Sequence, residues 1–552
     1  MPLTSSAKID RKLLPAPDAA SAAADLPYAP PEGLAEEVLV TVWSEVLALE
    51  QVGIDDNFFL LGGDSIRAIQ VRARAQKRGL KFSQQQLFEH QTIRALCRVI
   101  EFDERPGQQL VRVQPFEMCH DCERLQTAML EDAYPLTKLQ AGMLFHSELD
   151  PETAVYHDLH SFHLRLQFDE PKLRAAIQDI AQQHEVLRTS FNLNDYEHPL
   201  QLVHRQVEIP LEVEDFRHLS GDSLQRAIEM SLEMQKQRKF RWSEAPLVRF
   251  AVQRRTDETV QFVMCFHHSI LDGWSAASLL TSLFNRYYLL LRSGAEPLRK
   301  LAVAFKDYVA AERKALDDPG HHEFWGKVLE GIQPSNLPRI ATRPQAAGPR
   351  RSSAFEVTIP EGLSHGLRSI AVKSLVPLKS ILLAAHLRAM KAISGNSDVV
   401  TGIVSSGRIA EADGENVLGL FLNVLPFRLT VGRGSWIHLM NQTFEAERDM
   451  LPYRRYPLAE IQRIAGGQEL FETAFNFMHY HVYNNIERLS EAELLDYTGY
   501  EETNFALIAN FSLEPASKRI HLHLNYLPAE FTRDQVETFA GYYLRILQAM
   551  AT

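Results

Sequence analysis

The chain is 552 residues long, with 45% hydrophobic residues, 23% charged residues and a formal net charge of −12. At a prior of ~150 residues per domain, this length predicts three or four structural units, and the composition is that of an ordinary globular protein. The negative charge balance argues against a protein that binds nucleic acid or anionic membranes. The sequence also shows no apolar run long enough to span a bilayer.

Four cysteines occur, at positions 97, 119, 122 and 265. So few cysteines in a chain of this length do not form a disulfide framework, and the N-terminus lacks the apolar core of a secretory signal, so we predict a cytoplasmic protein. Cys119 and Cys122 have the C-x-x-C spacing of zinc and redox sites, but no second ligand pair and no thioredoxin-like context accompany them. We therefore interpret them as linker residues and expect no bound metal.

Residues 1–27 start with PLTSSAKIDRKLLP and continue with a stretch rich in Ala, Ser, Pro and Asp, which is typical of a flexible tether. The first half resembles the last motif of adenylation domains, with Lys8 at the position of the motif's lysine and Ala7 in place of its glycine. The resemblance implies that residues 1–27 are the remnant of an adenylation domain and a linker, cut from a longer multidomain chain.

Residues 28–103 predict a small helical bundle. A first helix carries an apolar stripe with helical spacing, a glycine-containing loop follows, and Asp64 is a good N-cap for a helix that begins at Ser65. Gly79 can end that helix, and Thr92 caps a last one. The stripe comprises Leu34, Val38, Val42 and Val46, widened by Trp43 and Leu47.

The loop before Ser65 reads DDNFFLLGGDSI and resembles the D-x-F-F-x-L-G-G-D-S motif of peptidyl carrier proteins. The resemblance implies that a separate phosphopantetheinyl transferase esterifies Ser65 with 4′-phosphopantetheine. The local chemistry agrees with this, because the glycines allow a tight turn and a phosphodiester is favoured at a helix N-terminus.

Residues 104–128 are predicted to be a linker, and a longer α/β region follows. Its segments alternate between strand-like and helical patterns. A proline-rich stretch at 334–350 predicts a crossing between two lobes, with boundaries at 129–335 and 336–552. The clearest strands are predicted at 162–168, at 398–408 (ending in a loop of small residues), at 471–477 and at 521–528, and the clearest helices at 171–183, 275–293 and 380–394.

The stretch HHSILDGWS at 267–275 lies between a predicted strand and a long predicted helix. In the strand, alternate apolar residues up to Phe266 share one face; His268 continues that face and His267 points the other way. Imidazole exchanges protons near neutral pH, and strand-to-helix turns present side chains to clefts. The sequence therefore predicts the chemistry at this turn.

The pattern H-H-x-x-x-D-G resembles the active-site motif of the condensation domains of non-ribosomal peptide synthetases, which share the chloramphenicol acetyltransferase fold. Weaker resemblances to condensation motifs occur at 134–146, 184–191 and 417–428, so the likeness covers nearly all of 28–552. It implies a multidomain chain: a small all-α four-helix carrier bundle followed by a two-lobed α/β (α+β) condensation domain of the chloramphenicol acetyltransferase-like fold.

The resemblance also implies roles for individual residues. His268 acts on the acceptor amine, as a general base or by positioning it, and Gly273 allows close backbone approach and offers an N–H group to an oxyanion. Asp272 is expected to pair with Arg188 and hold the loop. His267 and Trp274 are expected to support the site.

The implied function is peptide-bond formation, an acyltransferase reaction. Ser65 presents a donor aminoacyl or peptidyl thioester from an upstream adenylation domain, and the amine arrives on a downstream acceptor carrier. Two alternatives share the fold: a non-catalytic recruitment module and an epimerisation domain. Recruitment modules usually break the H-H-x-x-x-D-G motif and epimerisation domains replace its glycine, whereas both features are intact here. Heterocyclisation domains replace the histidines with aspartates and are excluded.

Overall fold

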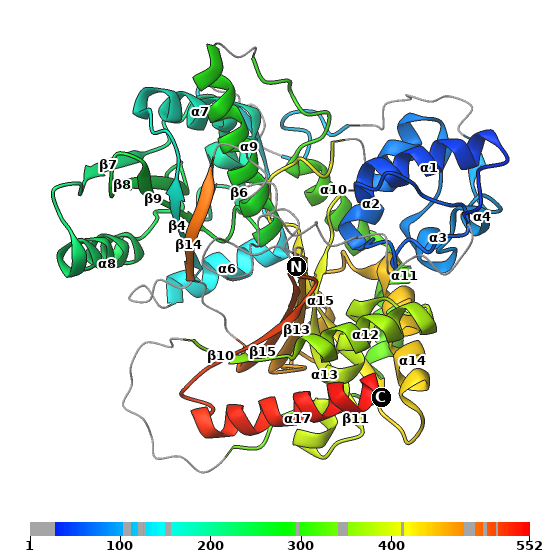
Figure 1. Cartoon of the computed structure of the whole chain (residues 1–552). Coiled ribbons are helices and arrows are strands. Elements are labelled where there is room, and N and C mark those ends of the chain that lie inside the picture. The colour runs from blue at the N-terminus through cyan, green and yellow to red at the C-terminus, as the bar shows by residue number, and fades with distance from the viewer. Residues whose placement is uncertain are drawn as a thin grey trace, which may run out of the picture. The chain divides into compact units, whose positions relative to one another are not determined.

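The computed structural model describes two compact units, Met1–Gly107 and Gln108–Thr552 (Figure 1). Lys8, Cys122, the rest of the segment 1–27 and most of the expected linker lie outside the described residues. The described residues are 28–102, 112–119, 125, 128–149, 156–293, 297–339, 352–409, 413–479, 492–500, 505–514 and 517–552.

The first unit is a bundle of α1 (Leu34–Leu47), α2 (Ser65–Lys77), α3 (Gln84–Glu89) and α4 (Ile93–Leu96). The rings of Trp43 and Phe58 meet edge to face in its core, with centroids 5.0 Å apart. The predicted four-helix carrier bundle is thus confirmed. The Thr92 cap is also confirmed, because the Thr92 side chain accepts a hydrogen bond from the backbone N–H of Ala95.

One residue of the apolar stripe predicted on α1, Leu34, does not lie on its buried face. Leu34 is 72% exposed. The buried face of α1 starts at Leu39, five residues later. At 3.6 residues per turn, the side chains of Leu34 and Leu39 point about 140° apart around the helix axis. The inward positions are Leu39, Val42, Trp43, Val46 and Leu47.

The N-lobe of the second unit contains a five-stranded sheet in the order β14-β4-β9-β8-β7. Its strands are β4 (His157–Arg165), β7 (Leu211–Asp215), β8 (Val248–Arg254), β9 (Thr259–His267) and β14 (Glu493–Tyr500). Every residue of the central strand β9 is buried. Such a strand is covered on both faces, which explains the long apolar run before the histidines.

Different helices cover the two faces of this sheet. On one face Phe262 packs against Phe284 of α9 (Gly273–Ser293), with ring centroids 5.2 Å apart, and α9 packs beside α7 (Glu170–Gln183). On the other face the side chains of Arg249 and Gln253 donate to those of Gln235 and Ser231 of α8 (Gly221–Gln237).

A three-stranded sheet, in the order β3-β6-β5, completes the N-lobe. It comprises β3 (Leu130–Pro135), β5 (Thr189–Asn192) and β6 (Leu200–His204), and α6 (Lys138–Leu149) follows β3 directly. Part of the expected linker packs here: the backbone N–H of Phe116 donates to Asp132 Oδ1 at 2.7 Å, and Cys119 Sγ lies 2.9 Å from Ala133 O. Cys119 is therefore a buried residue of this unit rather than an exposed linker position.

The C-lobe is a six-stranded sheet in the order β10-β16-β15-β13-β11-β12, in which β11, β13 and β15 are parallel. Its strands are β10 (Ser353–Val357), β11 (Asp398–Ser406), β12 (Leu422–Thr430), β13 (Thr473–His479), β15 (Leu507–Leu513) and β16 (Ile520–Tyr526). The helices of this part of the chain are α10 (Phe305–Asp317), α11 (Pro319–Leu329), α12 (Glu361–Ser374), α13 (Leu378–Ser394), α14 (Trp436–Met450), α15 (Leu458–Ile464) and α17 (Arg533–Ala551).

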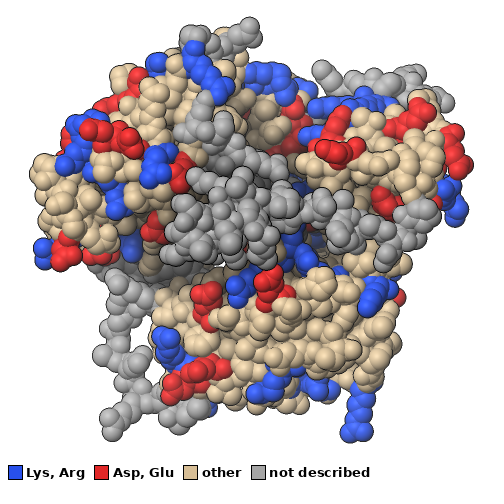
Figure 2. Space-filling view, viewed as in Figure 1, with Lys and Arg blue, Asp and Glu red and all other residues tan. Residues whose placement is uncertain are grey.

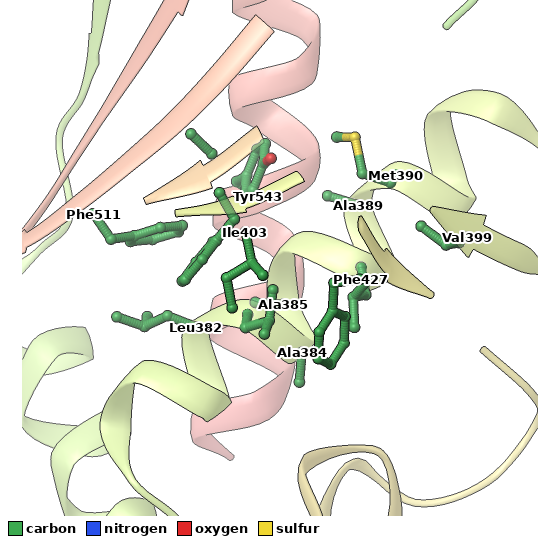
Figure 3. Packing of buried hydrophobic residues seen from close by; sticks show 14 of the residues in the cluster. Leu382, Ala384, Ala385, Ala389, Met390, Val399, Ile403, Phe427, Phe511 and Tyr543 are labelled. Carbon is green, nitrogen blue, oxygen red and sulfur yellow. The ribbon is translucent and has the colours of Figure 1, made fainter. Parts of the chain in front are cut away.

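The core of the C-lobe lies between its sheet and the helices α13 and α17 (Figure 3). Leu382 and Ala385 of α13 meet Ile403, Phe511 and Tyr543, all of them fully buried or nearly so. The strongly apolar sequence of α13 is explained by this position, because its side chains face the core over most of the circumference.

One strand from the C-lobe segment of the chain joins the N-lobe sheet. β14 follows β13 of the C-lobe sheet along the chain, yet it pairs antiparallel with β4 of the N-lobe sheet, from Glu493 opposite Arg165 to Tyr500 opposite Leu159 (Figure 1). The segment 336–552, predicted to be a lobe of its own, therefore supplies an edge strand to the other lobe. With this shared strand, the predicted two-lobed α/β fold is confirmed.

Among the described residues, no single helix is long and apolar enough to cross a membrane. Only α12 and α13 taken together reach that length and composition, and the pair is bent by 112° at its break. The visible face in Figure 2 carries Lys and Arg side chains interspersed with Asp and Glu, in keeping with the mixed charges of the sequence.

Candidate active site

The turn between β9 and α9 holds the two histidines. β9 ends at His267 and α9 begins at Gly273. The backbone N–H of His268 donates to Tyr156 O at 2.7 Å, and that of Ile270 donates to His267 O at 3.1 Å. These bonds extend the β4–β9 pairing by one residue, so His268 keeps the alternation of the strand.

His267 faces the α8 side of the sheet. Its ring is fully buried and lies against the ring of His157, with centroids 5.5 Å apart. The Ser269 hydroxyl lies 2.7 Å from Nδ1 of His267, and the backbone N–H of Ser269 donates to the same atom. Burial lowers the pKa of His267 well below its usual range, so the ring stays neutral. This environment supports the structural role expected for His267.

His268 faces the opposite side, as the alternation predicted. Its side chain is 24% exposed, and its Nδ1 lies 2.7 Å from Oδ2 of Asp158. Asp158 is paired with Phe266 across β4 and β9, which puts it on the face that His268 continues. Of the two histidines, His268 is therefore the one that a substrate can reach.

Asp272 fastens the start of α9. Its Oδ1 accepts a hydrogen bond from the backbone N–H of Ser275 at 2.7 Å, as an N-cap does, and its Oδ2 accepts one from the backbone N–H of Phe421 at 3.1 Å. Arg408 Nη2 lies 3.3 Å from Oδ1. A loop of the C-lobe thus closes on the first turn of the N-lobe helix.

The same C-lobe loop is held at Ser275. Arg408 donates to the Ser275 hydroxyl at 2.8 Å, and that hydroxyl donates to Gly419 O at 2.8 Å. Arg408 is fully buried, and burial lowers its pKa while Asp272 opposes that change. A buried guanidinium needs its carboxylate, so Arg408 and Asp272 depend on each other.

The predicted pair of Asp272 and Arg188 is wrong. Arg188 ends the 3₁₀ helix η3 (Glu185–Arg188), where its Nη1 lies 2.9 Å from Glu131 Oε2 and its Nε donates to Ala181 O at 2.9 Å. Its guanidinium therefore ties η3 and α7 to β3. The motif resemblance predicted a buried arginine partner for Asp272, and the topology gives that place to Arg408, 136 residues further along the chain than Asp272.

Gly273 is exposed at the first position of α9. A Cβ atom added there would meet no heavy atom of the described residues within 4 Å. Packing within the described protein therefore does not require glycine at this position. Trp274, the next residue, is partly buried. The roles expected for Gly273 and Trp274 stay predictions.

The loop before α2 is built by its own side chains. Asn57 Oδ1 accepts hydrogen bonds from the backbone N–H groups of Phe59 and Leu60, at 3.0 and 3.2 Å. A Cβ on Gly63 would lie 2.4 Å from ring atoms of Phe58, so only glycine fits there. These contacts fix the turn that leads to Ser65, the first residue of α2.

The start of α2 fits a phosphodiester. The predicted N-cap is confirmed, because Asp64 Oδ1 accepts a hydrogen bond from the backbone N–H of Arg67 at 2.8 Å. The first turn of this 13-residue helix contains no acidic residue, and its backbone N–H groups and dipole favour an anion. The backbone at the start of α2 is therefore compatible with an anionic group.

Two partners were missed by the sequence reasoning. Asp158 precedes a predicted strand and carries no signal of its own, and only the β4–β9 register brings it to His268. Arg408 follows a predicted strand, and nothing in the sequence distinguishes it from the other arginines as a partner for Asp272. Within the described part of the chain, no three or more His, Cys, Asp or Glu side chains are grouped to hold a metal ion.

Two family models match the chain: the phosphopantetheine attachment site at residues 37–100 and the condensation domain at residues 130–552. The AMB antimetabolite synthetase AmbE of Pseudomonas aeruginosa is 36% identical over the whole of this chain, which spans 26% of that protein. Tyrocidine synthase 3 of Brevibacillus parabrevis is 28% identical over 99% of this chain, which spans 8% of that protein.

Solved structures share the fold of the second unit. The condensation domain of the monacolin K polyketide synthase MokA matches with a TM-score of 0.64 and 16% identity, over 77% of this chain and 98% of that one. The four-domain non-ribosomal peptide synthetase AB3403 matches with a TM-score of 0.62 and 19% identity, over 76% of this chain and 33% of that one. Because the condensation-domain model covers most of the chain, the chain belongs to the condensation-domain family, whose members in non-ribosomal peptide synthetases are peptide-bond-forming acyltransferases. With its phosphopantetheine attachment domain, it is a carrier–condensation didomain of the non-ribosomal peptide synthetase class.

Proposed function

We propose that Ser65 carries the donor, an aminoacyl or peptidyl group, and that the condensation unit transfers it to the amine of an acceptor on a downstream carrier. The observation that carries this proposal is the partly exposed His268 in an intact H-H-x-x-x-D-G turn, in a chain that also contains the attachment domain. An attachment domain that precedes a condensation domain is on its donor side in the family's order.

The chain's own residues can serve this transfer. When bound, the 4′-phosphopantetheine arm supplies the thiol that holds the acyl group as a thioester. His268 takes a proton from the attacking amine or holds the amine by hydrogen bonding. The backbone N–H of Gly273 is at the first turn of α9, where helical N–H groups have no intrahelical acceptor and can donate to a developing oxyanion.

The proposal names three partners: an upstream adenylation domain that supplies the donor, a phosphopantetheinyl transferase that modifies Ser65, and a downstream acceptor carrier. Of the described cysteines, Cys97 and Cys265 are free thiols. The cytoplasmic location expected from the sequence stays a prediction.

A recruitment module is the second candidate function. The X-domain from teicoplanin biosynthesis has the same fold, with a TM-score of 0.64 and 19% identity, and was solved in complex with OxyB. The intact motif of this chain favours the enzyme. A recruitment module would bind carriers without forming a peptide, and an epimerisation domain would invert the loaded donor in the absence of an acceptor.

The test is a loading assay followed by condensation. A transferase first attaches an aminoacyl-phosphopantetheine to Ser65, an aminoacylated acceptor carrier is added, and intact-protein mass spectrometry follows both carriers. We expect a dipeptide on the acceptor. If His268 acts as a general base, His268→Ala lowers the rate by roughly 10²- to 10⁴-fold. His365→Ala, an exposed histidine on α12, is the matched control and keeps the parent rate.

Two results would overturn the proposal. Condensation by His268→Ala at the parent rate would remove His268 from the chemistry. A Ser65→Ala variant that still gains the mass of the arm would place the attachment elsewhere.

A further inference from the structure

Asp158 is the second residue of β4 and lies opposite Phe266 of β9. Side chains of directly opposed residues in an antiparallel pair lie on the same face. Because the pairing continues from Tyr156 O to the backbone N–H of His268, the side chains of Asp158 and His268 extend from neighbouring positions on one face of the sheet.

The carboxylate of Asp158 meets the inner nitrogen of His268. Oδ2 lies 2.7 Å from Nδ1, the Asp158 side chain is 5% exposed, and His268 is 24% exposed. The next side chain on this face of β4, His160, is occupied elsewhere: its Nδ1 lies 2.9 Å from the hydroxyl of Tyr497, and its ring stacks on Phe266 at an interplanar angle of 11°. In the part of the chain that the structure describes, His268 is the one side chain that pairs with the Asp158 carboxylate.

We propose that Asp158 is a positioning residue that acts through His268; this rests on the proposed catalytic role of His268. With Oδ2 2.7 Å from Nδ1, the carboxylate favours the ring tautomer that carries its proton on Nδ1, which leaves the lone pair on Nε2 at the other edge of the ring. When Nε2 takes up the proton of the attacking amine, the neighbouring carboxylate stabilises the imidazolium. As the new C–N bond forms and the C–S bond of the donor thioester breaks, Nε2 gives this proton to the departing phosphopantetheine thiolate, which leaves as the thiol, and the pair regains its initial state.

The buried position of the carboxylate strengthens this effect. A charge pair that is shielded from water interacts more strongly than an exposed pair, and salt screens it less. The aromatic rings of Phe266 and His160 lie beside Asp158 and exclude water from that side. The geometry therefore favours one orientation of the His268 ring before any substrate arrives.

The first experiment is Asp158→Asn, which keeps the shape and removes the charge. We expect the condensation rate at saturating acceptor carrier to fall by roughly 10- to 100-fold, the loss found when a metal-binding histidine is deprived of the partner of its other ring nitrogen. The KM for the acceptor carrier and the loading of Ser65 should not change. Asp179→Asn is the matched control, because it breaks a similar pair with Arg286 (2.6 Å) on α7 and α9 and should keep the parent rate.

The second experiment separates positioning from a merely structural role. In a His268→Ala background, Asp158→Asn should cause no further loss, since Asp158 acts only through His268. A structural role would lower the residual rate in both backgrounds by a similar factor. Asp158→Glu, which keeps the charge, should recover part of the rate, and Asp158→Ala replaces Asp158→Asn in the same cycle if thermal melting shows that the asparagine variant is unfolded.

The outcomes distinguish this inference from the proposed function. If His268→Ala is inactive while Asp158→Asn condenses at the parent rate, the positioning role of Asp158 is wrong and the role of His268 stands. If His268→Ala itself condenses at the parent rate, the proposed function of that histidine fails first.

Discussion

The loop that leads to Ser65 and the turn that carries His268 are built in opposite ways. In the carrier loop most hydrogen bonds of Asn57 and Arg67 join residues two to five positions apart, and the longest, from Asn57 Nδ2 to Gln91 Oε1, spans 34 positions. At the β9–α9 turn, the bonds that fix Asp272 and Ser275 reach residues 133 to 149 positions away. The carrier loop is thus held mostly by one short stretch and entirely within one small unit, whereas the β9–α9 turn is held only when the C-lobe closes on the N-lobe.

The largest effect is expected from breaking the long-range contact at its centre. Arg408→Met should destabilise the condensation unit by about 3–5 kcal/mol, because Asp272 is left buried without its cation. Urea unfolding measures this loss, and Ser65 should still be loaded at the parent rate. Arg463→Met is the matched control, since that arginine is 72% exposed and should change stability by less than about 0.5 kcal/mol. Equal stability of Arg408→Met and the parent would show that Arg408 does not secure the turn.

A second long-range contact should depend on pH. Glu312 Oε1 accepts a hydrogen bond from the backbone N–H of Lys138, 174 residues away, and burial raises the pKa of Glu312 from 4.5 to about 7. As pH rises from 4.5 to 7, the unfolded chain gives up this proton while the folded chain keeps it. The folded state therefore loses up to about 3 kcal/mol across that window and regains nothing above it.

Glu312→Gln tests this, because glutamine keeps the acceptor and cannot ionise. The variant should be more stable than the parent at pH 8 and nearly equal to it at pH 4.5, as measured by urea unfolding at both values. A stability difference that is the same at the two pH values would contradict the raised pKa.

A smaller effect is expected from the local site. Gly63→Ala brings a Cβ to 2.4 Å from the Phe58 ring and should destabilise the carrier unit by about 1–3 kcal/mol, with slower loading of Ser65. The unfolding of the condensation unit should not change. Gly273→Ala is the matched comparison: its Cβ meets no described heavy atom within 4 Å, so stability should stay within about 0.5 kcal/mol. Carrier stability unaffected by Gly63→Ala would show that the loop adapts.

The same contrast explains what the sequence could predict. The Asp64 and Thr92 caps and the opposite faces of His267 and His268 depend on residues close in the chain, and all were predicted correctly. The partner of Asp272 was assigned to Arg188 and is Arg408, because nothing local tells which distant arginine reaches a buried carboxylate.

Asp158 escaped prediction for a related reason. It needs the register of β4 against β9, which pairs residues about a hundred positions apart. Strand alternation shows which face a residue occupies, but it does not show which residue of another strand lies opposite. The motif thus predicted which of the two histidines is partly exposed, while the residues around it depended on topology.

The strand β14, which joins the N-lobe sheet, has a consequence for how the chain is made. The ribosome releases residues 157–165 of β4 long before it makes residues 493–500 of β14. Until then, the edge of β4 that pairs with β14 in the folded sheet has no partner. An open strand edge invites pairing with other chains. During synthesis the N-lobe must therefore wait for more than three hundred further residues while exposed to aggregation, and a chaperone bound at that edge should raise the yield of correctly folded enzyme.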